Sequence, residues 1–224
     1  FPSLVASQQQ YRRFPGFFAH TLLDSLPDYR RAGDSGLYYE PSYLFESYRS
    51  ALLDQVESHL TWKLLDDPTL DGRKLFDEFF ERYYGAAAAP MKALYCKIED
   101  IYGNPANYPP GYEDHQTEAV AWGYLGTESR MQELAALMDQ ARSAARSDLE
   151  KRRVALFDKG VWQKMAAGRA TYASSEKLRH STMRTLTVPR LAAVLGSDPR
   201  QVDWSRAAVL SGWRSVGPAD DRIL

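Results

Sequence analysis

The stretch that most constrains the fold is residues 71–102, DGRKLFDEFFERYYGAAAAPMKALYCKIEDIY. In its first half, large apolar residues recur at i, i+1, i+4 and i+5. On a helix this spacing forms one broad apolar face with charged residues outside it. The face consists of Leu75, Phe76, Phe79, Phe80, Tyr83 and Tyr84. The pattern therefore predicts an amphipathic helix that must bury this face against another element.

Gly85 and Pro90 divide the stretch into two helices. Gly85 is expected to end the first helix, because glycine adopts the left-handed conformation beyond a helix C-terminus at no steric cost. Pro90 is tolerated only in the first turn of the second helix. The second helix repeats the apolar stripe at Met91, Leu94, Tyr95, Ile98, Ile101 and Tyr102. Because the link is so short, the two helices are predicted to fold back as a hairpin.

Two helices are predicted before this hairpin. Residues 21–32 are spaced for a helix that Pro27 limits or kinks, and Gly33 ends it. Residues 43–65 form a longer helix with an apolar ridge at about every fourth position, which the sequence Asp-Asp-Pro terminates. The apolar positions are Leu22, Leu23, Leu26 and Tyr29 in the first helix, and Leu44, Tyr48, Leu52, Val56, Leu60 and Leu64 in the second.

A second helical hairpin is predicted after a long loop. Residues 103–126 are rich in Pro, Asn, Gly and Tyr, with a short helical segment over 117–124, and so long a loop is usually functional or wraps the molecule. Thr127 is the expected cap of the next helix, and a capping box formed by Ser147 and Glu150 opens the one after it. Their apolar positions are Met131, Leu134, Met138, Ala141 and Ala145, then Val154, Phe157, Val161 and Met165. After Tyr172 the apolar spacing breaks up.

Glu40 is the predicted catalytic residue. A short β-prone run over residues 37–39 ends on Glu40 and follows a helix and a tight turn, which is the order of an α/β unit. Catalytic groups of α/β barrels lie at the C-terminal ends of strands. Two alternatives weigh against this role. An acidic residue just before a helix also favours the helix dipole, and no second carboxylate pairs with Glu40 for glycoside hydrolysis.

His115 and Trp122, in the long loop, are predicted to bind substrate. His115 has acidic neighbours in EDHQTE, although a solvated polar loop explains it as well. Trp122 clusters with tyrosines that could stack on a sugar ring or instead anchor the loop to the core. The four histidines lack the spacing of a metal site, so no metal is expected. The single cysteine, Cys96, is expected to be a half-buried structural thiol.

Composition excludes several function classes. The net charge is −1, so nothing indicates nucleic acid binding, and no segment approaches the roughly 20 apolar residues of a membrane span. No phosphate-binding glycine loop or other cofactor motif occurs, and no cofactor is expected. The chain starts without methionine and stops without a closing element, so we expect a fragment or a processed product with no indication of its compartment.

Three segments resemble an uncharacterised bacterial family of glycoside-hydrolase-like proteins. LFDEFFERYYGAAAAPMKALYCKIEDIY is similar to its motif EF…RYYG.AA..M…Y, GLYYEP…LTWKLLDDPTLD resembles its G…E strand and L.WDP..D helix exit, and RVALFDKGVW resembles a later helix. The likeness covers residues 33–172. One departure is that the W.DP element is stretched here to WKLLDDP. The family combines a TIM-type barrel with a following helical region, distantly like the α-glucuronidases.

This resemblance implies a mainly α chain of three parts. Residues 1–66 would be the end of an α/β (TIM-type) barrel. Residues 67–185 would be a C-terminal helical domain of amphipathic hairpins, and residues 186–224 a linker and the start of a carbohydrate-binding β-sandwich. Glu40 would then face the sugar site, and Tyr39 beside it would bind substrate.

Three hypotheses about function follow. In the first, this is the C-terminal portion of a glycoside-hydrolase-like protein that acts on or binds carbohydrate, its helices buttress the barrel, and the chain alone is inactive. The second is a non-catalytic helical interaction module, and the third a carbohydrate-binding module that uses the loop over residues 108–124. The expected partners are carbohydrate, the rest of the same protein or a partner chain, and a second copy in a homo-oligomer.

Overall fold

The computed structural model describes residues 13–33 and 55–185, with side chains up to residue 176. Over these ranges every regular element is a helix and there is no strand, which confirms the mainly α prediction for this part of the chain. The predicted strand at 37–40, the first part of the helix predicted over 43–65, and residues 186–224 lie outside the described residues. Compact packing groups Phe1–Ala173 into one unit and Ser174–Leu224 into a second.

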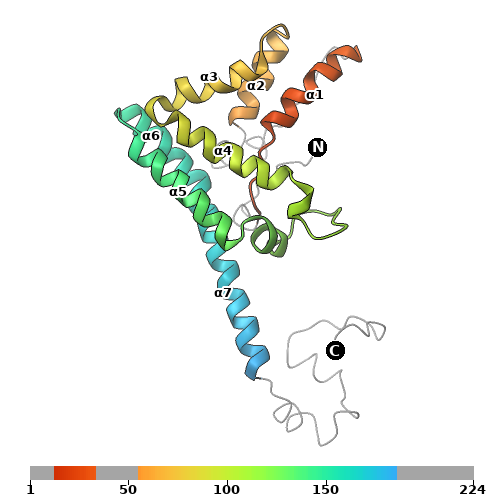
Figure 1. The fold of residues 1–224 in the computed structure, drawn as a ribbon, viewed down its shortest axis with the longest axis vertical. Coiled ribbons are helices and arrows are strands. Elements are labelled where there is room, and N and C mark those ends of the chain that lie inside the picture. Colours follow the sequence, from red (N-terminus) through yellow and green to blue (C-terminus); the bar gives the residue numbers. More distant parts are fainter. Residues whose placement is uncertain (1–12, 34–54, 186–224) are drawn as a thin grey trace, which may run out of the picture. The chain divides into compact units, whose positions relative to one another are not determined.

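The α-helices follow one another in chain order (Figure 1), with four short helical segments between them. The α-helices are α1 (Ala19–Arg31), α2 (Gln55–Asp66), α3 (Gly72–Tyr84), α4 (Ala88–Gly103), α5 (Glu128–Ala144), α6 (Asp148–Phe157) and α7 (Gln163–Thr185). The short segments are the 3-10 helices η3 (Gly85–Ala87) and η4 (Pro105–Asn107) and the π-helices η5 (Val120–Leu125) and η6 (Asp158–Trp162). None of the described helices is both long and apolar enough to cross a bilayer.

The predicted hairpin over residues 71–102 is confirmed as α3 and α4. The carboxylate of Asp71 accepts hydrogen bonds from the amides of Arg73 and Lys74, which caps the start of α3. Gly85 ends α3 with a positive φ of 55°, as predicted. A Cβ at Gly85 would also meet the carboxylate of Glu150, whose side chain would have to shift to make room.

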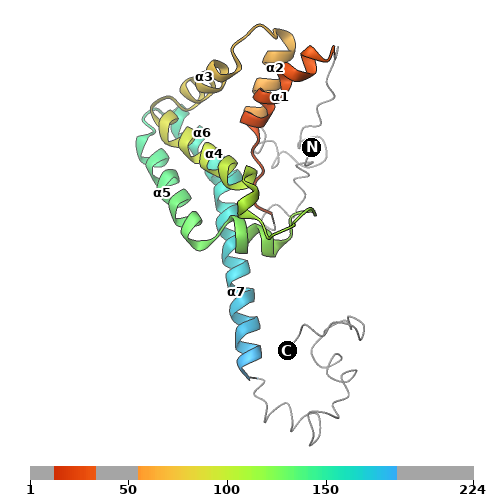
Figure 2. The same cartoon turned by 45° about the vertical axis from the view of Figure 1, so that its right-hand side comes forward.

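Helices α1 and α2 run parallel to each other. At their N-terminal ends the amide of Phe18 donates to Glu57 Oε1 at 3.0 Å, and at the opposite ends Arg30 Nη1 donates to the carbonyl of Pro68 at 3.0 Å. Figures 1 and 2 show the same direction for both helices, with α3 returning beside them. Since α2 ends at Asp66 before Asp67 and Pro68, the predicted end of the second helix is confirmed.

The second hairpin, α5 and α6, is confirmed with its cap. Ser147 accepts from the amide of Glu150, and the Glu150 side chain accepts from the amide of Ser147, which completes the predicted capping box. Thr127 is the N-cap residue of α5, but its side chain makes no capping hydrogen bond. The guanidinium of Arg142 on α5 binds both carboxylate oxygens of Asp158 and so ties the hairpin to η6.

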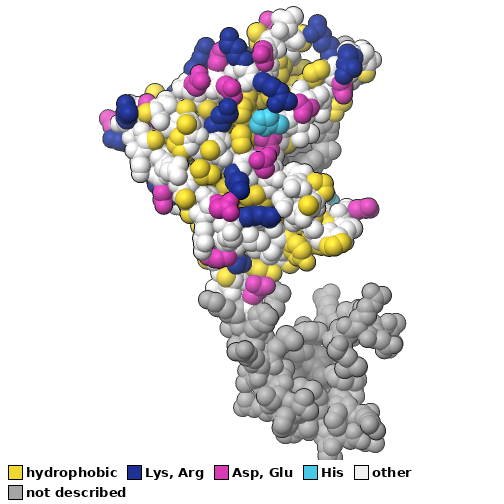
Figure 3. All heavy atoms as spheres, in the orientation of Figure 1, with side chains coloured by type: hydrophobic (Ala, Val, Ile, Leu, Met, Phe, Trp, Pro, Cys, Tyr) yellow, Lys and Arg dark blue, Asp and Glu magenta, His cyan; other side chains and the backbone are white. Residues whose placement is uncertain are grey.

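One core of apolar side chains joins the helices of the first unit. Phe76 and Phe80 of α3 meet the ring of Tyr95 on α4 edge to face, at centroid distances of 5.7 and 5.6 Å. The ring of Phe17 stacks flat on the ring of Tyr95 at a centroid distance of 4.5 Å. On the face shown in Figure 3, acidic and basic side chains of the described residues are interspersed rather than gathered by sign.

The end of α7 differs from what the spacing suggested. The apolar pattern stops at Tyr172, but the helix continues to Thr185. No proline or glycine interrupts residues 169–185, so the backbone can stay helical where the apolar stripe has ended. The helical segment predicted over 117–124 is present, and most of it is the π-helix η5.

Candidate functional site

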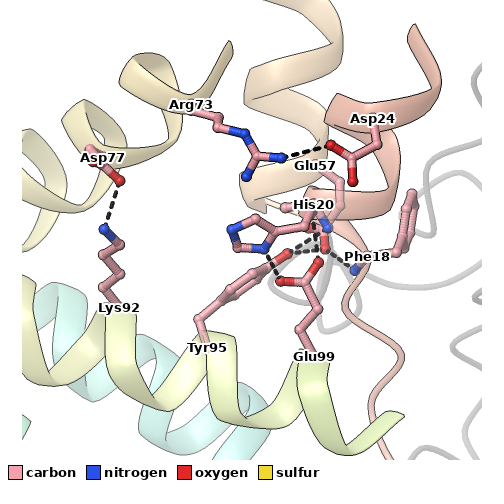
Figure 4. Close-up of polar contacts among 10 residues, drawn as sticks. Phe18, His20, Asp24, Glu57, Arg73, Asp77, Lys92, Tyr95 and Glu99 are labelled. Carbon is pink, nitrogen blue, oxygen red and sulfur yellow. Dashed lines mark hydrogen bonds and ion pairs between the residues drawn. The ribbon is translucent and has the colours of Figure 1, made fainter. Parts of the chain in front are cut away.

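Two buried carboxylates face the N-terminus of α1. Glu57 on α2 is 0% exposed and Glu99 on α4 is 7% exposed, and these are the buried acidic side chains of the described residues. Figure 4 shows both pointing toward the start of α1, with Tyr95 and His20 between and beside them. A buried charge is costly unless hydrogen bonds compensate it, so the contacts of this cluster decide what it can do.

The carboxylates bind the free backbone amides of α1. The first amides of any helix lack partners within the helix, and the N-cap residue Phe18 has no side chain able to supply one. The amide of Phe18 donates to Glu57 Oε1 at 3.0 Å, and the amide of His20 donates to Glu99 Oε1 at 2.7 Å. Between them the amide of Ala19 donates to the hydroxyl oxygen of Tyr95 at 3.3 Å. Three successive amides of α1 are therefore capped by α2 and α4.

Tyr95 links the cap to the core. Its hydroxyl donates a short hydrogen bond to Glu57 Oε1 while it accepts from Ala19. Burial raises the pKa of Tyr95 well above its usual value, and the negative charges of Glu57 and Glu99 raise it further. The phenol therefore stays protonated, which keeps its donor hydrogen for Glu57. The positive end of the α1 dipole lies at the same place and favours both carboxylates.

His20 forms the outer edge of the cluster. Its Nδ1 lies 2.5 Å from Glu99 Oε2, and because a carboxylate only accepts, Nδ1 carries the proton. Glu99 thus holds both the backbone and the side chain of His20. The imidazole packs against the ring of Phe76 at 4.7 Å and is partly exposed. Two surface ion pairs flank it in Figure 4, Asp24 with Arg73 and Asp77 with Lys92, each at 2.7 Å.

The geometry of this cluster suits holding α1 against α2 and α4 better than it suits catalysis. Glu57 is inaccessible to solvent, and Glu99 is engaged through both oxygens. A cavity beside Tyr95 is lined mainly by apolar side chains and holds no more than about one water molecule. Its lining includes Phe17, Val56, Phe80, Met91 and Phe157. A sugar ring does not fit in this cavity.

The residues predicted to act on substrate are placed as follows. Glu40 and Tyr39 lie outside the described residues. His115 is exposed in its loop, where its amide donates to Asp114 and its carbonyl accepts from the hydroxyl of Tyr112. The ring of Trp122 is 1% exposed and packs edge-on against Phe14 at 6.1 Å. The substrate-binding roles of these residues remain predictions.

The tyrosines of the long loop pack largely on one another. The hydroxyl of Tyr108 donates to the carbonyl of Tyr102 at 2.8 Å, and its ring stacks on Tyr112 at a centroid distance of 5.8 Å. These contacts fold the loop back onto the end of α4. Tyr124 on η5 is 47% exposed, whereas Tyr108 and Tyr112 are half-buried.

Cys96 and His59 have perturbed pKa values with a common main cause. Burial raises the pKa of the Cys96 thiol to about 11, so the thiol is protonated and unreactive at neutral pH, as expected of a structural cysteine. Burial lowers the pKa of His59, and the nearby charges of Lys63 and Arg82 lower it further. Over the part of the chain that the structure describes, no group of three His, Cys, Asp or Glu side chains is placed to hold a metal ion.

Sequence reasoning did not single out Glu57, Glu99 or His20. A signal was present, because Glu57 directly follows the apolar position Val56 and Glu99 lies four residues after Tyr95, within an apolar stripe. An acidic residue inside such a stripe is expected to be buried and paired. The partners of these carboxylates are backbone amides far away in the chain, and no sequence pattern identifies them.

Comparisons of the chain with protein-family models, curated proteins and solved structures gave no match.

Proposed function

We propose that the helices form a non-catalytic domain of a glycoside-hydrolase-like protein, in which they buttress the part that acts on carbohydrate. The observation that carries this proposal is that both buried carboxylates are engaged in capping α1. The hydrogen bonds of these carboxylates stabilise the start of α1. They therefore give no support for acid or base catalysis by this domain. The carbohydrate assignment rests on the resemblance over residues 33–172.

Glycoside hydrolysis explains why this observation matters. Most such enzymes place two carboxyl groups about 5–9.5 Å apart on opposite sides of the scissile bond, with the sugar between them. Glu57 is closed to solvent and bound to Phe18 and Tyr95, so a sugar cannot approach it. The catalytic pair would have to come from outside these helices, where Glu40 remains the candidate.

The test is an activity assay with matched variants. The 224-residue chain, incubated with a panel of 4-nitrophenyl glycosides and xylo- and gluco-oligosaccharides, is expected to give no turnover above buffer. In the native gene product, Glu40→Gln should lower turnover by about 1000-fold, a size typical for loss of a catalytic group. Glu99→Gln, with turnover corrected for the folded fraction, should stay within about threefold of wild type.

Two outcomes would change the conclusion. Turnover by the isolated chain that disappears in folded Glu99→Gln would contradict a non-catalytic domain. Turnover of the native gene product that survives Glu40→Gln with an unchanged fold would remove the role of Glu40 and favour the second hypothesis, a helical interaction module.

A further inference from the structure

Helix α6 carries two leucines on a side that the core does not cover. Val154 and Phe157 are 2% and 7% exposed and bury one side of the helix, whereas Leu149 and Leu156 are 47% and 48% exposed. A helix that packs through one apolar face normally carries polar residues on the others. The two leucines therefore remain open to a further contact.

These leucines and Arg152 form one continuous stripe along α6. Leu149 and Leu156 are seven residues apart, which at about 3.6 residues per turn places them within about 20° of each other around the helix axis. Arg152 follows Leu149 by three residues and precedes Leu156 by four. Side chains at both spacings are direct neighbours on a helix surface, with about 5–6 Å between their Cβ atoms. We call these three side chains the α6 stripe.

Basic side chains lie on both sides of the two leucines. Arg152 and Lys151 are exposed on one side, and neither forms an ion pair with another described residue. On the other side Arg153 Nη1 donates to the carbonyl of Tyr83 at 2.7 Å, and the guanidinium lies over the Tyr83 ring at 4.3 Å. Asp148, in the first turn of α6, is the exposed acidic residue of this helix. The stripe therefore offers apolar contacts in a basic setting.

The size and the charge of the α6 stripe indicate what binds it. Helix α6 has 10 residues and is about 15 Å long, so it cannot by itself supply the roughly 800 Å² that each side of a standard protein interface buries. A short helix laid along α6 matches this length. A second copy packed α6 against α6 about a twofold axis would instead place Arg152 against the same arginine of its partner, which is repulsive.

We propose that the α6 stripe binds a short amphipathic helix of a partner protein. The apolar side chains of that helix would cover Leu149 and Leu156, and its Asp or Glu side chains would pair with Lys151 and Arg152. The proposal does not rest on the carbohydrate assignment.

Binding of a labelled probe helix tests the proposal. The probe is a fluorescein-labelled synthetic peptide of Leu, Ala and Glu with its leucines on one helical face, and the control probe has Lys in place of each Glu. Fluorescence anisotropy is measured at low ionic strength while the 224-residue chain is added to each probe. We expect the Glu probe to bind at least tenfold more tightly, because the stripe is flanked by basic side chains. Equal affinities, or no binding of the Glu probe, would overturn the proposal.

Matched variants locate the binding surface. Arg152→Glu and Leu156→Ser should each weaken binding of the Glu probe at least fivefold. The control is Leu65→Ser on α2, whose leucine is 47% exposed, and it should leave binding unchanged. All three substitutions are on exposed side chains, so the fold should survive, and circular dichroism checks this. If all three folded variants bind the Glu probe as tightly as wild type, the α6 stripe is not the site.

Two other occupants would give different results. If Leu156→Ser removes a concentration-dependent dimer detected by analytical ultracentrifugation, the stripe binds a second copy of the chain. If the chain binds phosphatidylglycerol vesicles but not the Glu probe, and Leu156→Ser abolishes vesicle binding, the stripe contacts a membrane surface. Either result would show that the proposal is wrong.

Discussion

The first backbone amides of helices α1 and α6 find their hydrogen-bond acceptors in opposite ways. Each begins with backbone amides that have no partner inside the helix. At α6 the partners are Ser147 and Glu150, which lie within the first turn. At α1 the partners are Glu57 and Glu99, which are 39 and 79 residues from the amides that they bind. A helix start can therefore be encoded locally or supplied by the tertiary fold.

The caps of α1 and α6 differ in how much of the fold depends on each of them. The cap of α6 lies near the surface and is made mainly within its own first turn, with one further hydrogen bond from the amide of Ala86 to Glu150, so its loss should cost less. The cap of α1 is buried and joins three helices through Tyr95, so each member supports the others. Removing one partner there leaves buried polar groups without compensation, which is costlier than losing an exposed hydrogen bond.

Glu57→Ala should have the largest effect. It removes the acceptor for Phe18 and Tyr95 inside the core, and leaving these two donors unsatisfied is expected to cost about 2–5 kcal/mol in the free energy of unfolding. Urea denaturation followed by circular dichroism measures it. The control is Glu81→Ala on the exposed face of α3, expected within about 0.5 kcal/mol of wild type. If Glu57→Ala lowers the free energy of unfolding no more than Glu81→Ala does, the buried cap of α1 contributes no more to stability than an exposed side chain.

Tyr95→Phe sharpens the comparison by removing one hydroxyl. The ring keeps its stack with Phe17, but Glu57 and the amide of Ala19 lose a partner. The expected loss is about 1–3 kcal/mol. Tyr124→Phe, on an exposed tyrosine, serves as the control and should be neutral. Equal stability of the two variants would mean that the Tyr95 hydroxyl does not join the cap to the core.

These contrasts explain which parts of the fold could be predicted from sequence. Gly85 and the Ser147–Glu150 box act within a few residues, so their spacing alone predicts a helix end and a helix start. The cap of α1 depends on residues brought together only after α2 and α4 pack, so no local pattern predicts it. Trp122 shows the same limit, because exposed and buried aromatic rings in a loop look alike in a sequence.

Ser147→Ala tests the local cap and should cost less than either change at α1. Losing the side-chain acceptor for the amide of Glu150 is expected to destabilise by about 1 kcal/mol. The control is Ser143→Ala, on the exposed side of α5. Thermal unfolding by calorimetry provides the measurement. A loss comparable to that of Glu57→Ala would show that this cap, too, supports the whole core.

Glu150→Gln should have the smallest effect and depend on pH. Hydrogen bonds from the amides of Arg146 and Ser147 lower the pKa of Glu150 below its usual value of 4.5. A lowered pKa in the folded state means that the stabilisation is present above pH 4.5 and is lost as the pH falls through the folded-state pKa. The difference in melting temperature between wild type and Glu150→Gln should shrink from pH 7 to pH 3. A difference that grows on acidification would contradict this sign.

Amide hydrogen exchange at the start of α1 tests the central claim most directly. In the wild-type chain the amides of Phe18 and His20 should be protected, although no residue of α1 itself caps them. Glu99→Ala should remove the protection of His20 first and leave the amides of α6 unchanged. If the amide of His20 exchanges at the same rate in wild type and in Glu99→Ala, the buried carboxylates are not the caps of α1, and another role for them must be sought.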